Sequence, residues 1–223
     1  LQQIPARHPE LGPLIRSIFI PEEKTKWGSF DYSQQEPRLV AHYAASVNAN
    51  FTGADNFIKS YQNEEADFHQ LVADMAGISR TQAKTINLGL FYGMGKAKLS
   101  KELGISKDAA ENLLGKYHSR VPFVKRLAEA VTNSASKYGF IRTIRGRKCR
   151  FDMWEPATFG MNKAMQYEEA KAIYGNNIRR AFTYKALNRL IQGSAADMTK
   201  KSMVALYENG IIPHIQIHDE VDI

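Results

Sequence analysis

Four residues at intervals of four could form a binding surface for a nucleoside triphosphate. They are Arg80, Lys84, Leu88 and Tyr92. On a helix with 3.6 residues per turn, each interval advances the side chain by about 40°, so the four form a slowly winding stripe. The two cations come first, where backbone amides and the helix dipole favour anions, and the aromatic ring comes last, where a base could stack. An amphipathic helix with a solvated cationic edge would show the same spacing, so the stripe alone leaves both interpretations open.

Residues 79–95 carry the signals of a helix that would present this stripe. Ser79 and Gln82 fit a capping box, in which each side chain accepts a hydrogen bond from a backbone amide at the helix start. Gly93 and Gly95 are typical of a helix end. We therefore predict one helix over this segment.

An acidic residue ends a predicted strand in the first part of the chain. Residues 27–32, WGSFDY, predict a short strand that delivers Asp31 at its end. A predicted helix follows, with Pro37 in its first turn, a position that proline tolerates. Sites are often built on loops at strand ends, so we expect Asp31, Gln34 and Glu36 to lie together at an exposed edge.

The last residues, 211–223, alternate between apolar and polar side chains and predict a β-hairpin. We expect Asp219 and Glu220 at its tip, where two adjacent acidic residues commonly serve only to form the turn. Asp219 nevertheless falls in the apolar register, which makes it a candidate metal ligand. If this strand and the strand of Asp31 belong to one sheet, the two carboxylates form a pair of hard oxygen ligands suited to Mg²⁺.

A carboxylate pair and a cationic helix start together fit nucleotidyl transfer. Two Mg²⁺ ions about 4 Å apart can stabilise both the attacking and the leaving oxygen in a displacement at phosphorus. Cations at a helix N-terminus would hold a triphosphate and offset the charge that develops on it. This interpretation depends on the convergence of segments that lie far apart in the sequence.

Two further segments are candidate nucleic-acid contacts. Residues 139–151 alternate around Arg145-Gly146 and predict a basic β-hairpin, which suits phosphate contacts but would also fit a solvated hairpin. Its basic residues are Arg142, Arg145, Arg147, Lys148 and Arg150. Residues 162–209 predict mostly helix, on which Tyr184, Asn188 and Gln192 share a face that could read a minor groove.

Composition limits the classes of protein that fit the chain. Its 223 residues can bury a sizeable core, and its net charge of +7 favours a polyanionic partner. The single cysteine, Cys149, excludes an internal disulfide. There is no apolar run near 18 residues and no signal-peptide pattern at the start, so we expect an intracellular, cytoplasmic protein without a membrane partner. The abrupt start and the end on an apparent strand suggest a fragment.

Three motifs resemble those of family A DNA polymerases, the class of bacterial DNA polymerase I and phage replicative polymerases. DYSQQEPR at residues 31–38 resembles motif A, RTQAKTINLGLFYGM at residues 80–94 resembles motif B, and QIHDEV at residues 216–221 resembles motif C. LQQIPAR at the start, GRK at residue 146 and LNRLIQGSAAD at residues 187–197 resemble intervening segments. The motifs occur in the family's order, so the resemblance covers almost the whole chain.

The resemblance implies the catalytic and nucleotide-binding residues. Asp31 and Asp219 would bind two catalytic Mg²⁺ ions, with the backbone carbonyl of Tyr32 as a further ligand. Lys84 would also donate a proton to pyrophosphate, and Glu36 would exclude a ribose 2′-OH. The residues implied to contact the incoming dNTP are Arg80, Lys84, His69, Glu36, Tyr92, Leu88 and Gln34.

Primer–template contacts are implied for a second group, while Glu220 would support the metal site. The residues implied to contact DNA are Arg38, Asn188, Gln192 and His218, together with Arg145, Arg147 and Lys148 of the basic hairpin.

The family also implies an α+β fold of right-hand architecture, in which helical fingers are inserted into a palm with a small antiparallel sheet. Residues 1–60 would form the first part of the palm, residues 61–160 the fingers, and residues 161–223 the second part of the palm. We expect the thumb to be absent and the palm to be truncated after motif C. The parent phage or bacterial enzyme would act on primer–template DNA and dNTP as a monomer, whereas the isolated fragment could be inactive because the thumb holds the duplex.

Two departures from the family pattern affect nucleotide selection. Leu88 occupies a position that is usually aromatic, so its contact with the sugar ring is open. Pro37 replaces the usual leucine and favours an extended Glu36, which could displace the side chain that would act as the steric gate against a ribose 2′-OH.

A single-subunit RNA polymerase shares the motif pattern, but Glu36 argues against it, because such an enzyme must admit the 2′-OH. A non-catalytic nucleic-acid-binding module would give Asp31 and Asp219 no function. A metal-dependent nuclease would not need a triphosphate-binding helix.

Overall fold

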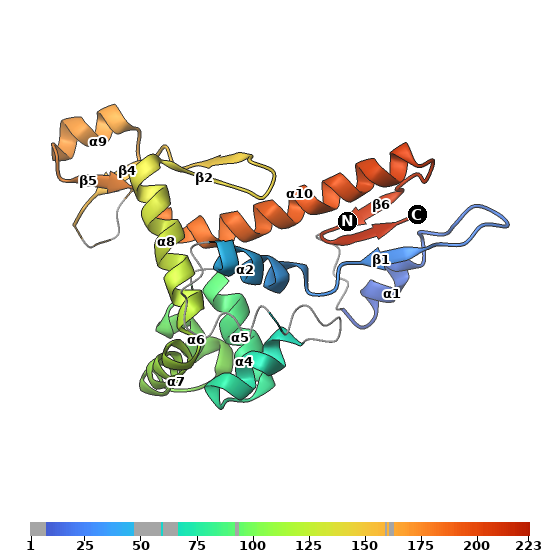
Figure 1. Ribbon diagram of the computed structural model, residues 1–223, viewed down its shortest axis with the longest axis horizontal. Helices are drawn as coiled ribbons and strands as arrows, with labels where there is room; N and C mark the ends of the chain where they lie inside the picture. Colours follow the sequence, from blue (N-terminus) through green and yellow to red (C-terminus); the bar gives the residue numbers. More distant parts are fainter. Residues whose placement is uncertain (1–7, 47–58, 60–66, 92–93, 159, 161–162) are drawn as a thin grey trace. The chain divides into compact units, whose positions relative to one another are not determined.

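Helices and small antiparallel sheets make up the described residues of the computed structural model, which are 8–46, 59, 67–91, 94–158, 160 and 163–223 (Figure 1). The predicted α+β class is confirmed. The chain divides into two compact units. One contains residues 1–35 and 195–223, the other contains residues 36–194, and each is described by itself. The assignment of palm and fingers to residue ranges stays a prediction.

The first unit contains a three-stranded antiparallel sheet in the order β1-β7-β6. These strands are β1 (Ser29–Asp31), β6 (Ile215–Ile217) and β7 (Glu220–Asp222). The central strand β7 pairs Glu220 with Asp31 on one side and with Ile217 on the other. The short helix α1 (Leu11–Arg16) and the second part of α10 (Ala186–Glu208) belong to this unit.

The tip of the terminal hairpin lies one residue earlier than predicted. His218 and Asp219 form the turn, because Ile217 pairs with Glu220. His218 adopts a φ of 56°, the positive value that the first position of tight hairpin turns often needs. The prediction of Glu220 at the tip was therefore wrong. Glu220 is the first residue of β7 and shares a sheet face with its cross-strand partner Asp31.

The second unit is built mainly from helices that enclose an apolar core. They are α2 (Gln35–Ser46), α4 (Phe68–Ala76), α5 (Arg80–Phe91), α6 (Lys96–Leu103), α7 (Lys107–Arg120) and α8 (Pro122–Tyr138). Fully buried side chains include Val72, Ile86, Leu99, Tyr117, Phe123 and Leu127. The helix α4 packs against α5 and α7, so these three helices together position the segment of α5 that carries Arg80 and Lys84.

The local helix signals act as the sequence predicts. The Ser79 hydroxyl accepts from the Gln82 amide at 3.2 Å, and the Gln82 side-chain oxygen accepts from the Ser79 amide at 3.1 Å, which completes the capping box. The helix does not extend to residue 95 as predicted. Its described part ends at Phe91, and Gly95 is the extended N-cap of α6.

The basic segment forms the predicted hairpin, with β2 (Phe140–Arg142) antiparallel to β3 (Lys148–Arg150). The described part of residues 162–209 is mostly helical, as predicted, but its first part also contains a strand that was not predicted. There α9 (Tyr167–Tyr174) is followed by β5 (Ile178–Arg180), which pairs with β4 (Trp154–Pro156), and by the 3₁₀ turn η1 (Thr183–Lys185). Cross-strand contacts stabilise this pair, since Arg179 bonds Glu155 at 2.8 Å and Arg180 lies over the Trp154 ring.

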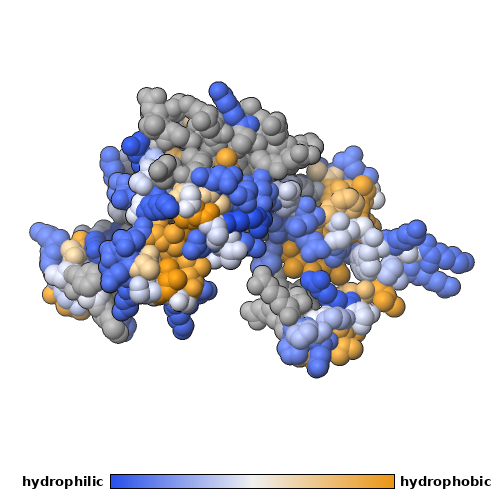
Figure 2. Space-filling view, turned by 90° about the horizontal axis from the view of Figure 1, so that it is seen from below, coloured by the Kyte–Doolittle hydropathy of each residue, from blue (hydrophilic) through white to orange (hydrophobic). Residues whose placement is uncertain are grey.

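The surface combines hydrophilic and apolar residues, as Figure 2 shows for one face. Large exposed apolar side chains include Ile18, Ile20, Phe30, Tyr184, Tyr207 and Ile212. No helix among the described residues has both the length and the apolar character that crossing a membrane requires.

Candidate active site

Strand pairing in the first unit brings the motif A and motif C carboxylates together. Asp31 ends β1 opposite Glu220, and the amide of Tyr32 donates to the backbone carbonyl of Asp219 at 3.3 Å. The two segments are almost the length of the chain apart in sequence. The condition on which the predicted carboxylate pair depends, that both strands lie in one sheet, is therefore met.

The electrostatics of this edge favour a bound cation. Burial, and then the negative charges of Asp219 and Glu220, raise the pKa of Asp31, while the amide of Tyr32 opposes that shift. A divalent cation would relieve the repulsion among these carboxylates. In the described part of the chain, no three His, Cys, Asp or Glu side chains form a complete metal cluster. Two carboxylate ligands would fit Mg²⁺, which typically takes one or two carboxylates from a protein and fills its shell with water and substrate phosphates.

Hydrogen bonds to α10 hold the segment between β1 and α2 within the first unit. The Tyr32 hydroxyl bonds the Ser202 hydroxyl. The side-chain amide of Gln35, which is only 4% exposed, donates to the Ala195 carbonyl at 3.4 Å and to the Thr199 hydroxyl at 3.3 Å. The backbone that carries Asp31 is therefore anchored at its C-terminal end to a long helix.

The backbone at the predicted steric gate is helical. Glu36 is the second residue of α2 and Pro37 the third, so the expectation that Pro37 keeps Glu36 extended was wrong. The first amides of a helix have no intrahelical acceptor, so proline loses no hydrogen bond there, and the helix overrides its preference for an extended preceding residue. Arg38 follows in the same first turns, and Gln34 precedes the helix with a φ of 53°.

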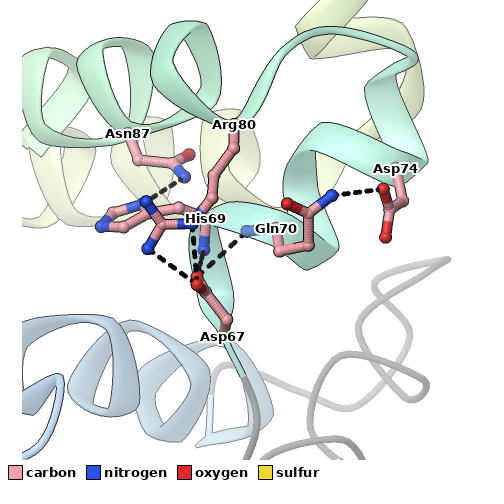
Figure 3. Close-up of polar contacts among 6 residues, drawn as sticks. All are labelled: Asp67, His69, Gln70, Asp74, Arg80 and Asn87. Atoms are coloured by element: carbon pink, nitrogen blue, oxygen red, sulfur yellow. Dashed lines mark hydrogen bonds and ion pairs between the residues drawn. The ribbon is translucent and has the colours of Figure 1, made fainter.

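In the second unit, α4 and α5 bring the predicted phosphate-binding residues together (Figure 3). Asp67 caps α4 by accepting from the amides of His69 at 2.9 Å and Gln70 at 3.1 Å. Its other oxygen accepts from Nε of Arg80 at 2.8 Å and lies 2.7 Å from Nη2. One carboxylate therefore links the start of α4 to the start of α5.

His69 lies within the electrostatic reach of both cations of the stripe. Burial lowers the pKa of His69, the Asp67 carboxylate opposes this, and the charges of Arg80 and Lys84 lower it further. The imidazole therefore favours its neutral form in the absence of an anion. The side chain of Lys84 is exposed on α5. The prediction that His69, Arg80 and Lys84 belong to one region is consistent with this arrangement.

Two predicted nucleotide contacts cannot be placed in this geometry. Tyr92 lies outside the described residues, and so does the side chain of Leu88, whose backbone is part of α5. Their proposed contacts with the base and the sugar stay predictions.

Within the second unit, the basic hairpin packs against the beginning of α10. Nη2 of Arg147 donates to the Gly193 carbonyl at 2.9 Å, and the amide of Ile144 donates to the Ser194 hydroxyl at 3.1 Å. A Cβ atom at residue 193 would lie only 2.9 Å from the Thr143 methyl group, so glycine permits this close approach. The predicted DNA contacts of the hairpin and of Gln192 thus adjoin one another.

The remaining predicted DNA contacts differ in their surroundings. Arg145 is exposed between the hairpin strands, and Nζ of Lys148 lies 4.7 Å from the centre of the Phe140 ring. The Nδ2 atom of Asn188 is buried and has no hydrogen-bond partner among the described residues. In the first unit, His218 is exposed in the hairpin turn, where its carbonyl accepts from the Gln216 side chain at 2.6 Å.

Sequence reasoning missed three polar residues next to the predicted phosphate-binding residues, namely Asp67, Asn87 and Tyr117. Asp67 contacts Arg80, and Asn87 bonds both His69 and Tyr117. Asn87 follows Arg80 by seven residues, so it returns to the same helix face, which is the only signal that points to it. The partnerships of Asp67 and Tyr117 depend on the packing of separate helices.

Comparison with known proteins agrees with the motifs. A DNA-directed DNA polymerase of Pseudomonas phage M6 is 37% identical, with 99% of this chain aligned to 36% of that protein. The thermostable DNA polymerase I of Thermus aquaticus is 33% identical, with 99% of this chain aligned to 25% of it. The chain thus spans about a third or less of the length of these relatives.

A solved structure shares the fold. The POL domain of Pol1 from M. smegmatis, in a complex with DNA primer-template and dNTP, matches with a TM-score of 0.72 and 29% identity over 100% of this chain and 37% of that one. The model of DNA polymerase family A matches residues 1–223. The chain therefore belongs to DNA polymerase family A.

Proposed function

We propose that this chain supplies the catalytic carboxylates and the triphosphate-binding helix of a DNA polymerase that extends a primer 3′-OH with dNTP. The pairing of Asp31 with Glu220, next to the bond between Tyr32 and Asp219, is the observation that carries this proposal. It supports a shared site for motif A and motif C, which a nucleic-acid-binding module would not need.

In this proposal Asp31 and Asp219 hold two Mg²⁺ ions, with the Tyr32 carbonyl as a further ligand. The ions supply Lewis-acid stabilisation of the attacking and leaving oxygens. Glu220 adds negative charge beside them and keeps its position through a hydrogen bond from the Ser29 hydroxyl. Motif A and motif C thus serve to hold the two metal ligands at a fixed separation.

The triphosphate is proposed to lie against the start of α5. Arg80 and Lys84 contact its charged oxygens, and His69 donates a hydrogen bond from its neutral imidazole. The primer 3′-OH releases its proton to solvent as its oxygen forms a bond to the α-phosphorus, and the bond between the α-phosphorus and the oxygen that bridges to the β-phosphorus breaks. Lys84 gives a proton to the departing pyrophosphate, which avoids the release of a more basic leaving group.

Selection of the nucleotide and contact with DNA involve the remaining residues. Glu36 excludes the ribose 2′-OH, Tyr92 stacks at the nascent base pair, and Leu88 and Gln34 complete the nucleotide contacts. The proposed primer–template contacts are Arg38, Asn188, Gln192, His218, Arg145, Arg147 and Lys148. The solved relative in complex with primer-template and dNTP supports these partner classes. We also propose that the protein acts as an intracellular monomer.

Primer extension by the full-length protein tests this function. With Mg²⁺, we expect dNTP-dependent extension, and we expect Asp219→Asn to reduce it by about 10³-fold or more while duplex binding is retained. Asp152→Asn, an exposed carboxylate outside the sheet, is the matched control. Normal extension by Asp219→Asn would refute the metal assignment, and a preference for rNTP would instead favour an RNA polymerase.

A further inference from the structure

A chain of two hydrogen bonds runs from the buried core to His69. The hydroxyl of Tyr117 on α7 donates to Oδ1 of Asn87 at 2.6 Å, and Nδ2 of Asn87 lies 3.2 Å from Nδ1 of His69. Tyr117 and Asn87 are both 0% exposed. Figure 3 shows the Asn87 amide on α5 directed at the imidazole on α4.

We infer that Tyr117 and Asn87 are positioning residues that keep the imidazole proton of His69 on Nε2, so that His69 presents an N–H donor to a nucleotide phosphate. Two contacts carry this inference: the Tyr117 hydroxyl donates to Oδ1 of Asn87, and the Nδ2 end of the same amide faces Nδ1 of His69. Its consequence for the phosphate depends on the triphosphate site proposed above.

The hydroxyl of Tyr117 is a permanent donor. Burial raises the pKa of Tyr117 far above its usual range, so the phenol keeps its proton at neutral pH. A buried hydroxyl proton needs an acceptor, and the oxygen of Asn87 is the acceptor it has among the described residues.

The orientation of the Asn87 amide follows from this donor. If the amide were turned around, its NH₂ group would face the hydroxyl, and the proton of Tyr117 would lose its acceptor. The oxygen therefore points to Tyr117 and the NH₂ group to His69. The location of Asn87 in the middle of α5, with both ends of its amide in contact, restricts the side chain further.

The NH₂ group in turn determines which imidazole nitrogen carries the proton. A neutral histidine has one acceptor nitrogen and one donor nitrogen, and Nδ1 must be the acceptor because it faces a donor. The proton is then on Nε2. A proton on Nδ1 would be directed at the NH₂ group, so the same contact also disfavours the protonated imidazole.

The inference can be tested on this chain without nucleotide. Long-range ¹H–¹⁵N correlation spectra of the chain labelled with ¹⁵N-histidine distinguish the two tautomers, and His69→Gln assigns the signal among the six histidines. We expect the Nε2–H tautomer in the wild type. A predominant Nδ1–H tautomer would overturn the inference.

Two variants change, in different ways, the positioning relay, which is the pair of hydrogen bonds from Tyr117 to Asn87 and from Asn87 to His69. Tyr117→Phe removes only the hydroxyl, which frees the amide to turn, so we expect the Nδ1–H form to become populated. Asn87→Asp places an acceptor opposite Nδ1, so we expect the Nδ1–H form to predominate. Tyr43→Phe is the matched control, because the Tyr43 hydroxyl bonds Ser194 elsewhere in the unit, and it should leave the tautomer unchanged. An unchanged tautomer in both relay variants would overturn the inference.

The affinity for dATP, measured by fluorescence competition, separates this inference from the proposed function. We expect Tyr117→Phe to weaken dATP binding several-fold without changing the circular dichroism spectrum. The control Tyr43→Phe should leave the dATP affinity unchanged. A shifted tautomer together with unchanged dATP affinity would support the positioning relay and refute the assignment of His69 to the triphosphate site.

Discussion

The Asp67 carboxylate engages the Arg80 guanidinium through Nε at 2.8 Å and Nη2 at 2.7 Å while its second oxygen caps α4. Burial acts to raise the pKa of Asp67, but the hydrogen bonds from the amide of Gln70, from Arg80 and from the amide of His69 outweigh it and lower the pKa. Asp67 therefore stays ionised near neutral pH. It directs a cation of the motif B helix without occupying Nη1, which remains able to contact an anion.

Replacing Asp67 should separate its two roles. The amide oxygen in Asp67→Asn would still accept from the two helix amides but would lose the ion pair, whereas alanine would lose both. We expect Asp67→Ala to reduce the free energy of unfolding by about 1 kcal/mol more than Asp67→Asn, the typical contribution of an N-cap. The ion pair itself should contribute less than about 1 kcal/mol, because the side chains of Arg80 and Asp67 are 51% and 37% exposed.

Urea denaturation of both variants measures this difference. Asp74→Asn is a suitable control, since Asp74 lies on the same helix and accepts from the Gln70 side chain without contacting Arg80. Equal losses for Asp67→Asn and Asp67→Ala would show that capping contributes little and that the ion pair carries the effect.

Neutralising Asp31 should stabilise the metal-free chain and abolish its response to Mg²⁺. The pKa of Asp31 is raised in the folded state by burial, Asp219 and Glu220. A carboxyl with a raised folded-state pKa favours folding below its unfolded pKa, and this contribution is lost as the pH rises through the folded pKa. At pH 7 the ionised Asp31 is therefore unfavourable, and Asp31→Asn should gain less than about 1 kcal/mol because the side chain is exposed.

Thermal unfolding with and without Mg²⁺ checks both parts. Mg²⁺ should stabilise the wild type by binding to the folded state and should have little effect on Asp31→Asn. Asp152→Asn should keep the response of the wild type. An equal Mg²⁺ response in Asp31→Asn would place the cation elsewhere.

Local chemistry explains which features the sequence predicts correctly. The capping box at Ser79 and the hairpin around Gly146 each depend on neighbours within a few residues. The one-residue error at Glu220 arises because alternation identifies two strands but does not determine where the turn between them lies. The strand β5 was missed because its partner β4 precedes α9 in the sequence, so no local turn signal joins the two strands.

Non-local contacts limit how much of the candidate site could be predicted from the sequence. Motif residues identify Asp31, Arg80 and Asp219, but nothing in the sequence pairs Asp67 with Arg80 or Tyr117 with Asn87. These contacts arise from the packing of α4, α5 and α7. The residues that contact Arg80 and His69, the predicted phosphate-binding groups, are therefore visible only in the folded unit.

Alanine at residue 193 should displace the basic hairpin and weaken DNA binding. The added Cβ would lie 2.9 Å from the Thr143 methyl group and 3.3 Å from Nη2 of Arg147. The Arg147 side chain is long and its end can move, but Thr143 is only 5% exposed, and its amide and hydroxyl both donate to the Arg147 carbonyl. We expect Gly193→Ala to lower the affinity for a primer–template several-fold in fluorescence anisotropy.

Gly115→Ala is the matched control for this substitution. It also places alanine within a helix, but a Cβ there meets no atom within 4 Å. We expect unchanged DNA affinity and a gain in stability of about 0.5–1 kcal/mol. Unchanged affinity in Gly193→Ala would mean that the contact between the hairpin and α10 does not order a DNA-binding surface.

Acidification should destabilise the chain in part through His69. Burial lowers the pKa of His69 in the folded state, with Arg80 and Lys84 acting in the same direction against Asp67. The unfolded chain then binds this proton more readily, so the stability contributed by neutral His69 is present above its unfolded pKa and is lost as the pH falls below about 6.5. The pKa of His118 is lowered as well, chiefly by burial, so two histidines contribute to the loss of stability with falling pH.

Urea denaturation at pH 7.5 and pH 5.5 measures this loss as a difference in the free energy of unfolding. The difference should be smaller for His69→Gln than for the wild type, and smaller still for His69→Gln combined with His118→Gln. The same loss in all three proteins would mean that other groups cause the acid sensitivity.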